Sequence, residues 1–143
     1  MNKVNKKILI VDDSPVSQKI TERILKKDGY DVLAAWGAVE CLKVLESEKP
    51  DLILMDVILN DGNGKEVAVR IKENPLTQNI PIVFTTNTLP LKEDKGNQAF
   101  DIKGQTYRAF AKPLHPQKIL SVIRKEINRS IYGGDLPKDI EIA

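Results

Sequence analysis

The stretch Leu52-Ile53-Leu54-Met55-Asp56 consists of four apolar residues that run directly into a carboxylate. An apolar run without alternation is typical of a strand that is buried on both faces, as in a parallel sheet. Asp56 then lies where the strand leaves the core. In an open parallel sheet, the ligand crevice lies at the carboxyl ends of the strands. The stretch therefore predicts a central strand with Asp56 at the edge where a functional site forms.

On both sides of this strand, strand and helix patterns alternate along the chain. Continuous apolar runs predict further strands at residues 8–11, 31–35, 81–86 and 108–111. Apolar residues at helical spacing predict helices at residues 15–27 and 37–46 and a last helix from Pro116. Val67, Ala68 and Ile71 predict a third helix, which Asn74-Pro75 stops. This alternation predicts an α/β fold: a doubly wound, five-stranded parallel sheet with helices on both faces.

Residues 87–107 depart from this alternation, because Pro90, Gly96 and Gly104 interrupt any helical pattern. We expect a weak or irregular fourth helix there, limited to a short helix within residues 92–102. At the C-terminus, residues 131–143 contain Gly133-Gly134 and Pro137. They are expected to form a tail or linker stub after a single domain that spans residues 1–130.

Composition narrows the class of protein. The net charge of +2 does not indicate a nucleic-acid partner. No apolar run approaches the roughly 18 residues that span a bilayer, and no signal peptide is visible. We therefore expect a cytoplasmic location and no membrane partner. Cys41 is the only cysteine, which excludes an internal disulfide, and its helical spacing with apolar neighbours predicts burial.

Polar residues follow several of the predicted strands. They are Asp12 and Asp13 after the first, Asp56 after the third, Thr86 after the fourth and Lys112 after the fifth. Neighbouring carboxylates repel each other, and a divalent cation with a preference for hard oxygen ligands, such as Mg²⁺, relieves that repulsion. An aspartate can act as a nucleophile and form an aspartyl-phosphate. A lysine ammonium and a threonine hydroxyl could then hold the phosphoryl oxygens.

The motifs that carry these residues read Ile8-Leu9-Ile10-Val11-Asp12-Asp13-Ser14, Leu54-Met55-Asp56, Phe84-Thr85-Thr86 and Ala111-Lys112-Pro113. In residue type, order and spacing, the sequence resembles a receiver domain of a two-component response regulator from about residue 7 to residue 128. The resemblance implies a flavodoxin-like fold with the strand order 2-1-3-4-5.

The resemblance also implies the roles of the site residues. Asp56 is expected to accept a phosphoryl group from the phosphohistidine of a sensor histidine kinase or a histidine phosphotransfer protein. Asp12, Asp13, Asp56 and the backbone carbonyl of Ile58 are expected to bind Mg²⁺. Thr86 and Lys112 are expected to contact the phosphoryl group and bias a conformational switch toward a downstream protein partner. The chain is then a phosphoacceptor signalling domain, not an enzyme, with slow autodephosphorylation.

Three positions depart from the family pattern. Asn60 replaces the usual proline four residues after the phosphoacceptor, and Asn87 replaces the usual Ala or Gly after the switch threonine. Ala109 replaces the usual aromatic three residues before the lysine. We expect Asn87 to obstruct the water that hydrolyses the aspartyl-phosphate, and the apolar Ile58 offers no group to orient that water. The alternative is that the Asn87 amide hydrogen-bonds this water and assists it. Because Ala109 lacks the switch aromatic, we expect no strong phosphorylation-dependent dimer through the fourth-helix face.

Two other functions are known for the same fold, and residues of this chain argue against both. A magnesium-dependent phosphatase with an aspartate nucleophile usually has a second Asp two residues later, where this chain has Ile58. A flavin or nucleotide carrier needs a phosphate-cradling loop after the first strand, where Asp12 and Asp13 would repel phosphate.

Overall fold

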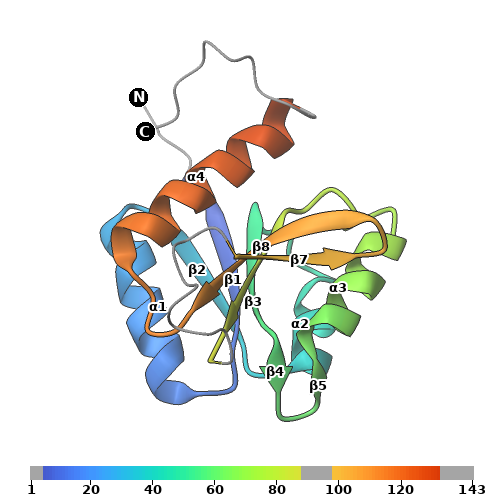
Figure 1. Cartoon of the computed structure of the whole chain (residues 1–143), viewed down its shortest axis with the longest axis horizontal. Helices are drawn as coiled ribbons and strands as arrows, with labels where there is room; N and C mark the ends of the chain where they lie inside the picture. The colour runs from blue at the N-terminus through green and yellow to red at the C-terminus, as the bar shows by residue number, and fades with distance from the viewer. Residues whose placement is uncertain (1–4, 88–97, 133–143) are drawn as a thin grey trace.

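The structure, a computed structural model, describes residues 5–87 and 98–132 (Figure 1). Its main sheet contains β1 (Lys7–Val11), β2 (Asp31–Ala35), β3 (Leu52–Asp56), β6 (Ile82–Thr86), β7 (Gln98–Ile102) and β8 (Gln105–Ala111). A second, short hairpin is formed by β4 (Ile58–Leu59) and β5 (Gly62–Asn63). The helices are α1 (Pro15–Lys27), α2 (Ala38–Val44), α3 (Gly64–Glu73) and α4 (Pro116–Tyr132).

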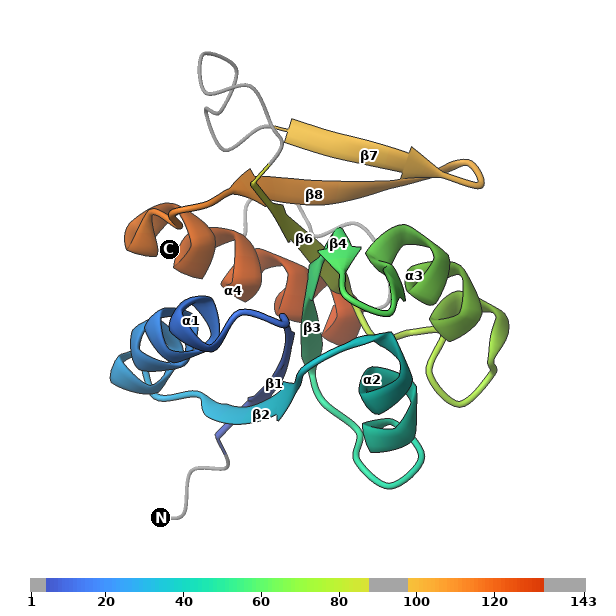
Figure 2. The same ribbon diagram turned by 90° about the horizontal axis from the view of Figure 1, so that it is seen from below.

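The sheet order is β2-β1-β3-β6-β8-β7, and the first five strands in that order are parallel. The predicted order 2-1-3-4-5 is confirmed. Figure 2 shows α1 and α4 on one face of the sheet and α2 and α3 on the other. The core is correspondingly divided into two clusters, with Leu25 and Ile123 in one and Cys41 and Ile71 in the other. The predicted burial of Cys41 is confirmed.

The sixth strand, β7, is a correction. Residues 98–102, expected within a short helix, form a strand that pairs antiparallel with β8; residues 92–97 lie outside the described residues. Lys103 and Gly104, with φ values of 51° and 81°, form the turn, and positive φ at both positions suits the twist of a two-residue hairpin. Phe100 and Ile102 pack against the α2/α3 side of the core. This pairing also makes β8 longer than predicted.

Helix α1 begins as the sequence predicts. The Ser14 side chain accepts a hydrogen bond from the Ser17 N–H at 3.2 Å, and Pro15 occupies the first turn. Its apolar stripe, however, is largely exposed: Val16 is 69% and Ile20 50% accessible. The buried side of α1 contains Gln18, Thr21 and Leu25. The polar Gln18 therefore faces the sheet and has a role in the site.

At the C-terminus, α4 extends to Tyr132, and the predicted tail falls mainly on residues 133–143, which lie outside the described residues. Among the residues that the structure describes, no helix combines the length and apolar character that crossing a bilayer requires.

Candidate functional site

The carboxyl ends of β1 and β3 bring three acidic residues together. Carboxylate oxygens of Asp12, Asp13 and Asp56 all lie within 4.8 Å of one another. Asp12 is 2% and Asp56 5% exposed, so both carboxylates are largely removed from water. The sequence-predicted acidic cluster is thus present, at the edge of the sheet where the strand ends meet.

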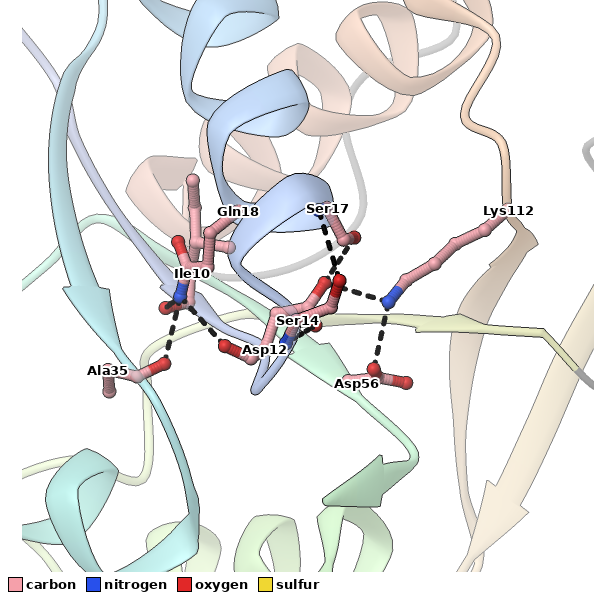
Figure 3. Close-up of polar contacts among 8 residues, drawn as sticks. All are labelled: Ile10, Asp12, Ser14, Ser17, Gln18, Ala35, Asp56 and Lys112. Carbon is pink, nitrogen blue, oxygen red and sulfur yellow. Dashed lines mark hydrogen bonds and ion pairs between the residues drawn. The ribbon is translucent and has the colours of Figure 1, made fainter. Parts of the chain in front are cut away.

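Lys112 provides the positive charge in this cluster. Its Nζ lies 2.7 Å from Asp12 Oδ2 and 2.8 Å from Asp56 Oδ2 (Figure 3). Its side chain is only 11% exposed, so water screens these two ion pairs weakly. The Lys112 N–H donates to the Thr86 carbonyl at 2.9 Å, which fixes the backbone of the lysine against the end of β6.

Burial and charge act in opposite directions on the pKa values of Asp56 and Lys112. Burial raises the pKa of Asp56, although the hydrogen bond and charge of Lys112 oppose that rise. Burial lowers the pKa of Lys112, but its hydrogen bonds to Asp12 and Asp56 outweigh this effect and the pKa is raised overall. The ammonium is therefore held protonated between two carboxylates.

Hydrogen bonds from α1 orient Asp12. Its Oδ1 accepts from the Ser14 N–H at 3.0 Å, and its Oδ2 accepts from the Ser17 hydroxyl. The buried Gln18 amide donates to the backbone carbonyls of Ile10, Asp12 and Ala35 at 2.9–3.1 Å (Figure 3). Sequence reasoning missed Ser17 and Gln18, because they lie within α1, whose sequence has no unusual feature apart from its N-cap.

The segment after Asp56 is tied to the same site. The Val57 N–H donates to the Thr85 carbonyl at 2.9 Å, and the Gly64 N–H donates to the Val57 carbonyl at 2.7 Å. The Ile58 backbone N–H donates to the Asp56 carboxylate. A Cβ on Gly64 would lie 2.1 Å from the Asp56 carbonyl oxygen, so only glycine permits this close approach.

Thr86 is the last residue of β6, one position beyond Thr85, the partner of Asp56, and Asn87 follows the strand. Thr86 is fully buried, whereas Asn87 is exposed. Asn87 and Lys112 line one pocket of about 270 Å³, together with Val16, Ile20 and Leu114. Ala109 is buried, and the ring of Phe84 packs edge-on against Phe100 and Tyr107, with centroids 5.6 and 5.8 Å apart.

The donor set fits a hard divalent cation. Three carboxylates supply oxygen ligands without any nitrogen or sulfur, which favours Mg²⁺ over the transition metals. Because Asp13 is only partly buried, the cluster also has an open side toward water. Asp12 and Asp56 are nearly inaccessible and share the Lys112 ammonium, so the cluster is not a group of solvated surface acids.

Comparisons with known proteins agree with this geometry. The family model of the response regulator receiver domain matches residues 8–124. The chain is 32% identical to the phosphate regulon transcriptional regulatory protein PhoB of Pseudomonas aeruginosa over 97% of this chain and 58% of that protein. It is 27% identical to protein PilH of the same species over 82% of this chain and 93% of that protein.

A solved structure extends the comparison to the metal. It is the receiver domain of a sensor histidine kinase from Pseudomonas aeruginosa with a magnesium ion coordinated in the active-site cleft. The two chains are 25% identical, with a TM-score of 0.73 and coverage of 87% of this chain and 99% of that one. The chain spans about half the length of the first curated relatives it matches, 58% and 50% for two transcriptional regulatory proteins.

Proposed function

Because the chain belongs to the response regulator receiver domain family, whose members accept phosphoryl groups from histidine kinases, we propose that Asp56 is its phosphoacceptor. One observation carries the assignment. Asp56 stands at the end of the central strand β3, within 4.8 Å of Asp12 and Asp13 and 2.8 Å from the Lys112 ammonium. Of the three carboxylates, it alone contacts both the lysine and the loop that carries Ile58.

The proposed metal ligands are Asp12, Asp13, Asp56 and the backbone carbonyl of Ile58. Mg²⁺ bound there supplies positive charge that offsets the repulsion between the carboxylates and a phosphoryl group. The buried Gln18 and the Ser17 hydroxyl hold Asp12 in orientation, as partners of metal ligands do.

The proposed reaction is a phosphoryl transfer. An oxygen of the Asp56 carboxylate attacks phosphorus, and the bond from phosphorus to the imidazole nitrogen of the donor breaks, with the electron pair leaving on the imidazole. The Lys112 ammonium then pairs with a phosphoryl oxygen, and the Thr86 hydroxyl donates to another after the strand end adjusts. The proposed switch is this change of hydrogen-bond partner at the Thr86 hydroxyl.

A protein phosphodonor fits the surface beside this site. Val16 and Ile20 on α1 are exposed, and they border the pocket that contains Lys112. A neighbouring, largely apolar pocket of about 580 Å³ continues between α1 and α4, lined by Ile24 and Leu120 among others. Exposed apolar area next to a reactive group is typical of a protein interaction surface. We therefore propose a histidine kinase or a histidine phosphotransfer protein as the donor.

We propose that the aspartyl-phosphate hydrolyses slowly by itself and that the chain does not turn over a substrate as a phosphatase does. A phosphatase with an aspartate nucleophile would use an acid at the position of Ile58, and Ile58 is an apolar side chain that is 58% exposed. It offers no proton donor to a leaving group.

Intact-mass spectrometry tests the phosphoacceptor. Incubation with acetyl phosphate and MgCl₂ should add one phosphoryl group to the parent chain and none to Asp56→Asn. The control is Asp31→Asn, which changes an exposed aspartate at the start of β2 that is not part of the acidic cluster. Equal labelling of Asp56→Asn and the parent would reject Asp56.

A further inference from the structure

We propose that Asp61 is a positioning residue for the metal site: its carboxylate fastens the β4–β5 hairpin to α2 and so holds Ile58 beside Asp56. The inference rests on the proposed function, because it concerns the metal ligand that Ile58 would provide. Asp61 itself is an exposed residue at the tip of the hairpin, with no place in the acidic cluster.

The contact is made by both carboxylate oxygens. Asp61 Oδ1 accepts from the Ala38 N–H at 2.7 Å, and Oδ2 accepts from the Val39 N–H at 3.1 Å. These are N–H groups of the first turn of α2, which have no partner within the helix. A single side chain therefore connects the hairpin after β3 with the helix that follows β2.

The hairpin depends on such a contact, because it is very short. Only two residue pairs form it, Ile58 with Asn63 and Leu59 with Gly62. A two-stranded hairpin is marginally stable by itself even when it is longer. Its base is fixed by the bonds of Val57 and Gly64, and its tip is fixed by Asp61. Ile58 lies between these two attachments.

Gly37 gives independent support for the contact. A Cβ at residue 37 would lie 2.7 Å from Asp61 Oδ1 and 3.0 Å from both Cγ and Oδ2. The backbone of Gly37 is extended, with φ −178°, so it would accept any residue. A side chain at residue 37 would therefore displace the Asp61 carboxylate from its place against α2, although the backbone itself would accept it. Residues 37 and 61 are coupled through this single packing contact.

The test is a calorimetric titration of Mg²⁺ into the full chain, with the melting temperature measured in parallel. Loss of a partner that orients a metal ligand typically weakens affinity by about 10- to 100-fold, and because Asp61 is exposed we expect a loss of about tenfold. Asp61→Ala and Gly37→Ala should each show it. The double variant should lose no more than either single variant, because both remove one contact.

Asn74→Ala is the matched control. Asn74 Oδ1 accepts from the Leu76 N–H at 2.9 Å, which is also a side-chain bond to the backbone in an exposed loop, but after α3. Its Mg²⁺ affinity should equal that of the parent. Hydrogen exchange at the Ile58 amide gives a second measurement, since Asp61→Ala should speed exchange there while leaving the amides of β3 protected.

The outcomes separate the two proposals. A parent chain that does not bind Mg²⁺ would overturn the proposed function and, with it, the role of Asp61. A parent that binds Mg²⁺, with Asp61→Ala binding equally well and Ile58 exchange unchanged, would overturn the role of Asp61 alone. Additive losses in the double variant would show that residues 37 and 61 act through different contacts, against the inference.

Discussion

Replacing Lys112 with methionine should destabilise the protein in a magnesium-dependent way. The ammonium contacts Asp12 and Asp56 at 2.7 and 2.8 Å, and the side chains of the three residues are 11%, 3% and 7% exposed. Removing one partner of a buried ion pair costs about 3–5 kcal/mol. We expect the lower end, about 3 kcal/mol, because N–H groups of Ser14 and Ile58 still bind the carboxylates.

This free energy corresponds to a measurable change in melting temperature. An unfolding entropy of about 2.1 cal/mol/K per residue gives about 0.3 kcal/mol/K for a chain of this length. A loss of about 3 kcal/mol then lowers Tm by about 10 °C. In EDTA, Lys112→Met should melt about 10 °C below the parent; at saturating Mg²⁺ the difference should fall to less than about half, because the cation replaces the missing charge.

The control is Lys7→Met. Lys7 pairs with Glu48 at 3.2 Å, but both side chains are well exposed, at 38% and 40%. Such a pair contributes at most about 1 kcal/mol, and Mg²⁺ should not change the effect. The measurement is thermal unfolding followed by circular dichroism in EDTA and in MgCl₂. Equal Tm losses for Lys112→Met in both buffers would refute the view that Lys112 and the metal neutralise the same charges.

Three further predictions concern the same site. Gly64→Ala should lower stability by about 1–3 kcal/mol and weaken Mg²⁺ binding, because its Cβ would meet the Asp56 carbonyl at 2.1 Å. A variant with the melting temperature and the Mg²⁺ affinity of the parent would contradict this. Asn87→Ala should shorten the lifetime of the phosphorylated state by admitting water, and slower decay of labelled protein would instead make Asn87 a water-positioning group. Because burial raises the pKa of Asp56, protons should displace Mg²⁺ at a pH above the usual aspartate pKa of about 3.9. A Mg²⁺ affinity that stays constant as the pH is lowered to that value would contradict the raised pKa of Asp56.

The sign of the Asp56 effect on stability follows from the same shift. With a raised pKa, the folded protein holds the Asp56 proton more tightly than the unfolded chain does. This contribution favours the fold at acidic pH and is lost as the pH rises through the folded pKa. Magnesium, which binds the ionised form, should recover stability at neutral pH.

The strand ends could be predicted from the sequence because each is marked by a local pattern. The unbroken apolar run before Asp56 determines both the buried strand and the edge where its carboxylate emerges. The same reasoning placed Asp12, Asp13 and Lys112, and parallel pairing then brings them together. Which oxygen meets which nitrogen could not be predicted, since that depends on side-chain conformations in the folded core.

The misses have identifiable physical causes. Lys103-Gly104 could have been read as a hairpin turn, but the lysine at a positive-φ position hid that signal. The exposed Val16 and Ile20 show that an apolar stripe locates a helix without fixing its buried side. Gln18 is buried because three backbone carbonyls accept its amide, a tertiary arrangement that helical spacing does not encode.

The most direct test of the central claim is to locate the phosphoryl group. Borohydride reduction of the phosphorylated chain converts an aspartyl-phosphate into homoserine, which tandem mass spectrometry assigns to a position. Asp56, paired with Lys112 at the end of β3, should be the residue converted, and only after incubation with a phosphodonor and Mg²⁺. Homoserine at position 12 or 13, or conversion that is unaffected by EDTA, would contradict the account.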